Sequence, residues 1–140
     1  MEDCLFCKIA NKENPAKIVF ENDHAVAFLD VNPRSPGHTM VISKYHSRNL
    51  FDLPEEELSN LFAAVQRVAR RIEGALRPDG FSIGINHGAA SGQEVDHLHV
   101  HIMPRFYGDN GREVQSLVHN PPKESLEDIA EKIRTFANNH

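Results

Sequence analysis

The stretch HLHVHIMPR, His97 to Arg105, places three histidines at alternate positions and puts apolar residues between them. Side chains alternate faces along a β-strand, so His97, His99 and His101 are predicted to share one face while the apolar residues enter a core. Three close imidazoles oppose one another's protonation, which favours neutral, nucleophilic or metal-binding forms near neutral pH. The alternatives are a histidine-rich exposed strand face and a metal site made by these three histidines alone.

The length of the chain predicts a single domain that contains this strand. The chain has 140 residues, enough to bury a core without disulfides or oligomerisation, so we expect one domain over residues 1–140. The N-terminus carries early charges and no long apolar run, which predicts neither a signal peptide nor a membrane span, and a cytoplasmic location. A formal charge of −5 lacks the broad basic surface that a polynucleotide requires, so we expect no nucleic-acid partner, although a small phosphorylated ligand fits a local donor cluster.

The hydrophobic pattern switches between periods of two and 3.6 residues, which is typical of a mixed fold. Strands are predicted at Ile18 to Glu21, Ala25 to Leu29, Thr39 to Ser43, Phe81 to Ile85 and Leu98 to Met103. Asn22 and Asp23 suit a tight turn between the first two strands. The prediction is therefore an α+β domain with a largely antiparallel, five-stranded sheet.

Two helices complete this prediction. Apolar residues recur at helical spacing from Pro54 to Leu76, and Pro78 and Gly80 are expected to end that helix. Ser125 with Asp128 predicts a capped C-terminal helix whose apolar face closes the core or lines the pocket. That face comprises Leu126, Ile129, Ile133, Phe136 and Ala137. The core of the domain is expected over about residues 4–105, with a C-terminal extension over about 106–140.

The alternation His-Leu-His-Val-His-Ile-Met resembles the signature of the histidine triad (HIT) superfamily. The blocks from Pro15 to His46 and from Gly92 to Arg105 are similar to the family in order and spacing, so the resemblance covers most of Cys4 to Arg105. The Pro-Arg ending is more similar to the bacterial, archaeal and fragile-histidine-triad branches than to the nucleoside-phosphoramidase branch. The resemblance implies a HIT-like fold and a homodimer. The helix from Pro54 to Leu76 either contributes to that interface or packs only on its own sheet.

The activity that the resemblance implies is nucleotidyl hydrolysis or transfer at the α-phosphorus of a purine nucleotide conjugate, with no catalytic cofactor. By family position His99 is the expected nucleophile, forming a nucleotidyl-histidine intermediate that water resolves. His101 is expected to contact phosphate and to move protons at the leaving group, and His38 to flank the same site. Dinucleoside polyphosphates, adenosine phosphoramidates and adenylyl sulfate all present the same α-phosphorus.

The resemblance also implies residues that hold the nucleotide. Asp30 matches the position on the ribose hydroxyls, and its alternative role is that of a turn residue. Asn86 and Gln93 are expected to donate to phosphate, and capping of their loop is the alternative. Some branches carry a hydroxyl residue directly after this glutamine, whereas this chain has Glu94. A carboxylate at that position would repel a phosphate unless its side chain points away. The expected base pocket, for which ordinary core packing is the alternative, comprises Phe6, Ile9 and Phe28.

Four residues form a second constellation, separate from the predicted chemistry. Cys4 and Cys7 are the only cysteines, and with His46 and His97 they would satisfy tetrahedral zinc, as in similar bacterial members of the family. Free thiols or a redox pair are the alternatives. A structural zinc would leave His97 to position His99 without acting as an acid or base. The remaining histidines match no motif and are expected on the surface: His24, His87, His119 and His140.

Three functional classes follow from these patterns. The favoured one is a metal-independent nucleotidyl hydrolase that uses His99. The second is a nucleotide-binding regulatory module with little turnover. The third is a zinc hydrolase with the triad as ligands, which is disfavoured because the sequence matches no acidic ligand nearby.

Overall fold

The computed structural model describes residues 3–136 and contains one five-stranded antiparallel sheet. The first three strands lie at the predicted residues, β4 begins one residue earlier, and β5 begins one residue later and ends two later. The α+β prediction is therefore confirmed. In spatial order the strands are β1 (Ile18–Glu21), β2 (Ala25–Leu29), β3 (Thr39–Ser43), β5 (His99–Arg105) and β4 (Gly80–Gly84).

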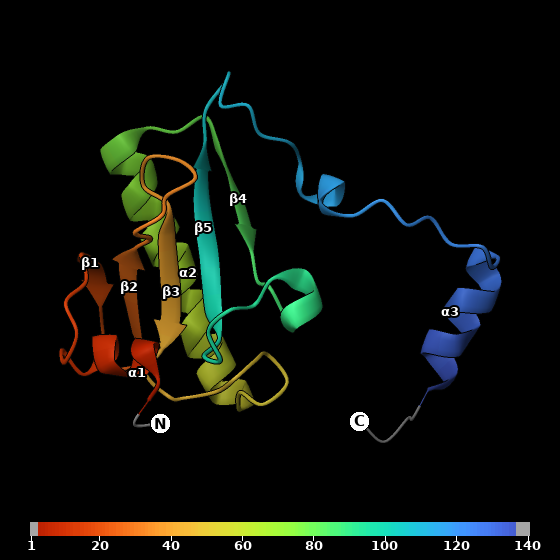
Figure 1. Ribbon diagram of the computed structural model, residues 1–140, viewed down its shortest axis with the longest axis horizontal. Coiled ribbons are helices and arrows are strands. Elements are labelled where there is room, and N and C mark those ends of the chain that lie inside the picture. Colours follow the sequence, from red (N-terminus) through yellow and green to blue (C-terminus); the bar gives the residue numbers. More distant parts are fainter. Residues whose placement is uncertain (1–2, 137–140) are drawn as a thin grey trace.

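The predicted long helix, α2 (Glu55–Leu76), covers one face of this sheet (Figure 1), and its part in a dimer interface stays a prediction. Its buried residues pack against alternate residues of the central strands, including Val41 and Val100, in the main core cluster. The helix ends at Leu76, where Arg77 adopts a left-handed conformation with φ 52°. The buried residues of α2 are Leu61, Ala64, Val65, Val68 and Ile72.

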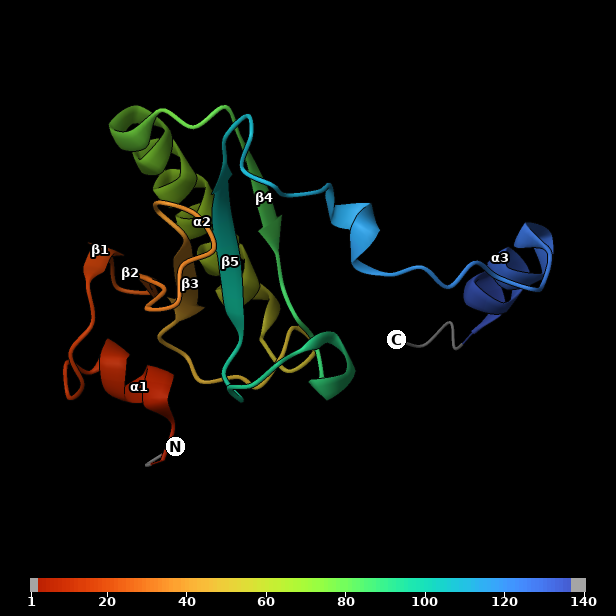
Figure 2. The ribbon, with the colours of Figure 1, turned by 45° about the horizontal axis from the view of Figure 1, so that its top comes forward.

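The opposite face of the sheet carries a short helix, α1 (Leu5–Ala10), which the sequence analysis did not predict (Figure 2). A six-residue helix is too short for its periodicity to register in a hydrophobic pattern. Its first turn is capped by the Cys4 sulfur, which accepts from the Cys7 backbone N–H at 3.4 Å. Phe6 and Ile9 of α1 pack into a second cluster with residues of β2 and β3.

The loop between β2 and β3 is held close to the rest of the domain by Gly37. This residue has φ +87°, and a Cβ there would lie 2.5 Å from Leu76 Cδ1 and 3.2 Å from Pro104 Cγ. Glycine is required for both the backbone conformation and the space. The close approach fixes His38, which directly follows Gly37, against β5.

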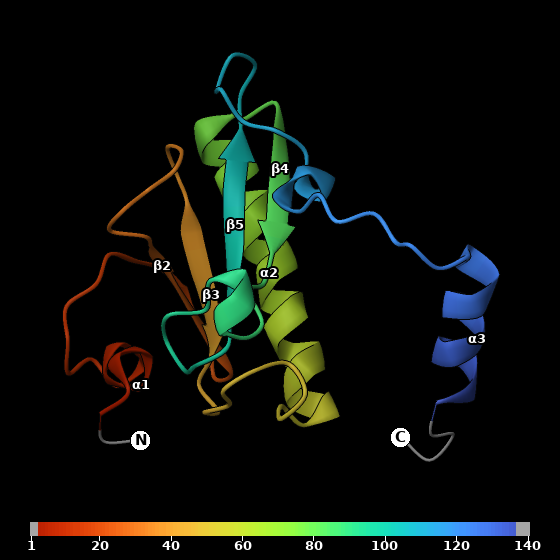
Figure 3. The same cartoon turned by 45° about the vertical axis from the view of Figure 1, so that its right-hand side comes forward.

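The C-terminal segment departs from the prediction. Ser125 caps α3 (Leu126–Thr135) by accepting from the Asp128 N–H at 3.1 Å, as expected. No described residue of α3 is buried, however, and the helix stands away from the sheet (Figure 3). The prediction that it closes the core or lines the pocket is wrong, because the exposed segment with Pro121 and Pro122 carries it outward. Ala137 lies outside the described residues.

None of the helices between residues 3 and 136 is long and apolar enough to cross a membrane. The longest of them, α2, carries three acidic residues in its first turn.

Candidate functional site

The three histidines of the opening stretch lie on one side of the sheet, as predicted. His97 precedes β5 and is fully buried, His99 is 8 % exposed, and His101 is partly exposed. The His99 and His101 rings are 5.1 Å apart between centroids. The residues that follow each histidine join the core under α2 and comprise Leu98, Val100 and Ile102. The exposed-face alternative is therefore wrong for His97 and His99.

His99 is held in one tautomer by the backbone. Its Nδ1 lies 2.7 Å from the carbonyl oxygen of His97. A carbonyl only accepts hydrogen bonds, so Nδ1 carries the proton and donates it. In the neutral ring Nε2 then holds a free lone pair, which is the form that a nucleophile needs.

His101 is fixed in the opposite tautomer by a chain of two hydrogen bonds. The Arg34 backbone N–H donates to His38 Nδ1 at 3.1 Å, so a neutral His38 carries its proton on Nε2. That Nε2 donates to His101 Nδ1 at 2.9 Å. His101 consequently carries its own proton on Nε2, so β5 presents a lone pair on His99 and a proton on His101.

Burial favours the neutral forms of His38 and His101. It lowers the pKa of His101 to about 4, and the charges that His99 and His38 would carry lower it further. The pKa of His38 is also lowered by burial, against the opposing effect of the Asp30 carboxylate. The expected neutral forms are therefore supported by the surroundings of both residues.

An NMR titration of the His101 Cε1–H resonance, identified by its loss in His101→Ala, should give a midpoint of about 4. Because the folded pKa lies below the unfolded value of about 6.5, the unfolded chain takes up a proton first. His101 thus contributes stability above pH 6.5 that is lost as the pH falls toward 4. A midpoint at or above 6.5 would contradict this burial effect.

Asp30 lies at the edge of this site. Its Oδ1 accepts from the Asn32 N–H at 2.9 Å, as a turn residue does, and its Oδ2 lies 3.6 Å from His38 Nε2. Asp30, His38 and His101 bring potential metal-ligand atoms within 4.8 Å of one another. An acidic potential ligand therefore does lie near His101, although the sequence matched none there and a zinc hydrolase was disfavoured on that ground. Contact of Asp30 with a ribose stays a prediction.

The loop before β5 contains the short 3-10 helix η1 (Ala89–Ser91), and Gln93 organises it. The Gln93 amide oxygen accepts from the Gly88 N–H at 2.9 Å, and its nitrogen donates to the Arg48 and Val95 carbonyls at 2.8 and 3.1 Å. These contacts match the loop-capping alternative. Phosphate contacts by Gln93 and by the partly buried Asn86 stay predictions.

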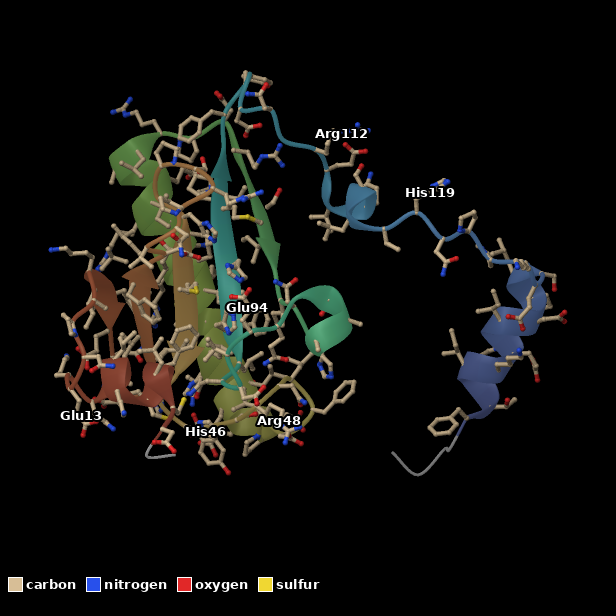
Figure 4. The ribbon with its side chains drawn as sticks, in the orientation of Figure 1. Glu13, His46, Arg48, Glu94, Arg112 and His119 are labelled. Carbon is tan, nitrogen blue, oxygen red and sulfur yellow. The ribbon has the colours of Figure 1, made fainter. Side chains whose placement is uncertain are left out.

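Glu94 is exposed and lines a cavity together with Cys4 and His46. Figure 4 places Glu94 in front of the sheet, and His46 and Arg48 near its lower end. The carboxylate therefore belongs to the side of the molecule that carries the cysteines.

The three expected base-pocket residues are buried in the second core cluster. Phe6, Ile9 and Phe28 are only 4 %, 6 % and 2 % exposed. The Phe6 ring meets the His99 ring edge-on, with centroids 5.1 Å apart. The structure thus shows their packing role, and base contact stays a prediction. Of the histidines that match no motif, three are exposed as expected, namely His24, His87 and His119. His140 lies outside the described residues.

Cys4, Cys7, His46 and His97 bring four potential ligand atoms together. His97 Nδ1 lies 3.4 Å from Cys4 Sγ, 3.5 Å from Cys7 Sγ and 3.2 Å from His46 Nδ1. Tetrahedral zinc with ordinary bond lengths separates its ligand atoms by about 3.3 to 3.8 Å. The spacing therefore fits zinc.

The protonation of these ligands also fits a metal. His97 Nε2 donates to the Ser43 carbonyl at 2.9 Å, which leaves the Nδ1 lone pair for an ion. Burial, reinforced by the neighbouring Cys4, raises the pKa of Cys7 to about 11, so without a metal this thiol is protonated. A protonated thiol is a poor redox nucleophile, whereas zinc displaces the proton and binds the thiolate.

Comparison with known sequences finds one family. The model of the HIT domain matches residues 11–108. A HIT-like protein of Methanocaldococcus jannaschii is 46 % identical over 106 residues, covering 76 % of this chain and 81 % of that protein. The adenosine 5'-monophosphoramidase of Saccharomyces cerevisiae is 37 % identical (73 % and 62 % covered), and an adenylylsulfatase of Arabidopsis thaliana is 38 % identical (74 % and 52 % covered).

Solved structures agree with this result. A member of the HIT family from Bacillus subtilis superposes with a TM-score of 0.85 at 33 % identity, covering 99 % of both chains. A zinc-bound histidine triad family protein from Mycobacterium smegmatis gives a TM-score of 0.74 at 35 % identity, covering 88 % of this chain and 85 % of that one.

Proposed function

This chain belongs to the HIT family, and we propose that it cleaves purine nucleotide conjugates at the α-phosphorus through a covalent intermediate on His99. The observation that carries the proposal is the pair of opposite tautomers, a free lone pair on His99 and a proton on His101. The relatives named as a phosphoramidase and an adenylylsulfatase support it. Both names describe cleavage of a bond between an adenylyl group and a leaving group.

In the first step the His99 Nε2 lone pair attacks the α-phosphorus in line with the leaving group. A P–N bond to His99 forms as the bond from phosphorus to the leaving oxygen or nitrogen breaks. The His101 Nε2–H donates a hydrogen bond to the leaving atom, and the leaving group takes the electron pair of the broken bond: a phosphate leaves as its anion, and an amine takes a proton from solvent. The positive charge of the nucleotidyl-imidazolium is stabilised by the His97 carbonyl at His99 Nδ1. The lowered pKa keeps His101 neutral, so its Nε2–H donates a hydrogen bond without placing a second cation in the buried site.

In the second step water attacks the phosphorus and the P–N bond to His99 breaks. The electron pair of the P–N bond returns to His99 Nε2, the proton that the water loses passes to solvent, and the nucleoside monophosphate leaves. Both rings are then neutral, with their original tautomers held by the His97 carbonyl and the Arg34 N–H.

The nucleotide is proposed to place its ribose on Asp30 and its phosphate near Asn86 and Gln93. The cysteine and histidine cluster is proposed to hold a structural zinc, which the zinc-bound mycobacterial relative supports. We also propose a homodimer through the edge strand β4 and the adjacent face of α2, where Ile83 and Phe62 are 42 % and 41 % exposed.

Intact-mass spectrometry of the wild-type protein tests the proposed function. After rapid, acid-free quenching with diadenosine triphosphate or adenosine 5'-phosphoramidate, we expect a protein adduct heavier by one adenylyl group. The P–N bond is acid-labile, so the quench avoids acid. Tight binding of both compounds with neither adduct nor product would instead support a nucleotide-binding module.

A further inference from the structure

A cavity of about 340 Å³ opens at the end of β5, beyond the histidines, none of which lines it. Met103 and Arg105 line it from β5, on the same face as His101, and Arg34 and Ser35 line it from the β2–β3 loop. Successive residues on one face of a strand lie about 6.6 to 6.8 Å apart. The cavity thus begins one step beyond His101, at the end of the sheet opposite the cysteine cluster, near Arg112 in Figure 4.

Most charges around the cavity are already paired. The Asp109 carboxylate accepts from Arg105 Nε at 2.8 Å, Arg105 Nη2 at 3.2 Å and two backbone N–H groups. Glu113 lies 3.7 Å from Arg112 Nε. In the part of the chain that the structure describes, Arg34 has no acidic partner. One positive charge therefore remains for an anion in the cavity.

Ser35 adds an unsatisfied polar group. Its hydroxyl oxygen is buried and has no hydrogen-bond partner among residues 3–136. A buried hydroxyl without a partner costs free energy, and an oxygen of a ligand in this cavity would provide the missing bond. The loop that carries Arg34 and Ser35 is tied to the site, because the Arg34 N–H bonds His38 and the Ser35 carbonyl accepts from the His38 N–H at 3.0 Å.

The direction of the reaction points to the same cavity. In-line displacement puts the nucleophile and the leaving group on opposite sides of the phosphorus. With His99 as nucleophile and His101 next along the strand as hydrogen-bond donor to the leaving atom, the leaving group lies on the His101 side. The charge of Arg34 acts on this side of the site. The pKa of His38 is lowered mainly by burial, is raised by Asp30, and is lowered further by the smaller effect of Arg34.

We propose that this cavity is the leaving-group subsite and that it selects an anionic phosphate chain, held by the Arg34 guanidinium and the Ser35 hydroxyl. The inference rests on the proposed function of His99. The volume lies at the lower end of the usual range for small-molecule sites, about 300 to 1,000 Å³, which suits a phosphate chain and part of the group that it bears. Apolar side chains of Met103, Val114 and Leu117 line the remainder. The preferred substrates are accordingly dinucleoside polyphosphates, above conjugates with a neutral amine.

The test compares kcat/KM for diadenosine triphosphate and adenosine 5'-phosphoramidate in Arg34→Gln, Ser35→Ala and the wild type. We expect Arg34→Gln to lower the value for diadenosine triphosphate by about 10- to 100-fold, as loss of a charge-assisted contact does, and Ser35→Ala by about 3- to 10-fold. The phosphoramidate should change by less than about two-fold, because the amine engages neither group. The control is Arg67→Gln, which removes an exposed arginine of α2 and should alter neither substrate.

Equal losses with both substrates, or no loss with either, would overturn the subsite. If the wild type turns over neither compound, the proposed function fails, and calorimetric binding of inorganic tripolyphosphate decides the subsite alone. A Kd about ten-fold weaker in Arg34→Gln than in Arg67→Gln supports it, and equal values refute it. Thermal melts of all variants establish that each is folded.

Discussion

Replacing His99 by alanine should lower kcat by about 10⁴-fold or more and abolish the nucleotidyl adduct. The imidazole supplies the only free lone pair that β5 directs at the site, since His101 presents a proton and the His97 ring bonds Ser43. Without it, water must attack the conjugate directly, in a single harder step. Single-turnover kinetics and intact-mass spectrometry with diadenosine triphosphate measure both effects.

The matched control is His119→Ala, which removes an exposed histidine far from the sheet (Figure 4). It should keep both turnover and adduct. The Kd for nucleotide should change by no more than a few-fold in His99→Ala, because the lost ring is not the main contact of the ribose or the base. An adduct of undiminished yield in His99→Ala would move the nucleophile to another residue and refute the assigned tautomers of His99 and His101.

The sequence predicted the histidine face because it depends on one rule, the alternation of side chains along a strand. The same rule placed Leu98, Val100 and Ile102 in the core. It could not predict the tautomers of His99 and His101. Those are decided by a backbone carbonyl and by the Arg34 backbone N–H, which have no residue-specific signal in the sequence.

Other differences have equally local causes. Gln93 was expected to donate to phosphate, but its amide is engaged by three backbone groups whose positions depend on the folded loop. Asp30 stands near His38 because its backbone N–H donates to the His38 carbonyl at 2.9 Å, just beyond the paired ends of β2 and β3. The apolar face of α3 predicted burial, yet periodicity shows only that a helix has an apolar face and not what covers it.

Removal of zinc should lower the melting temperature by about 10 °C or more while leaving the reaction mechanism in place. Binding to the folded state alone stabilises by about 4 kcal/mol when the free metal exceeds Kd a thousand-fold, and one kcal/mol corresponds to several degrees in a domain of this size. The metal would join α1 to the residues that precede β5, since Cys4 and Cys7 flank the start of that helix and His97 adjoins His99.

We expect one zinc per chain by elemental analysis, and its loss in a Cys4→Ser, Cys7→Ser double variant. His24→Ala, which removes an exposed histidine outside the cluster, should retain the metal and the melting temperature.

Chelation also separates the structural role of zinc from a catalytic one. The four potential ligands do not include His99, which would touch the ion only through its neighbour His97 and is oriented by the His97 carbonyl. Metal-free protein below its melting temperature should therefore still form the adenylyl adduct on His99, with kcat reduced by no more than about ten-fold through looser positioning.

Complete loss of turnover in a protein that circular dichroism shows to be folded, restored by added zinc, would favour metal-bound water as the nucleophile. The group of Asp30, His38 and His101 would then be the place to look for that ion. Retention of the adduct excludes that alternative, because an attacking metal-bound water forms no bond between the protein and phosphorus.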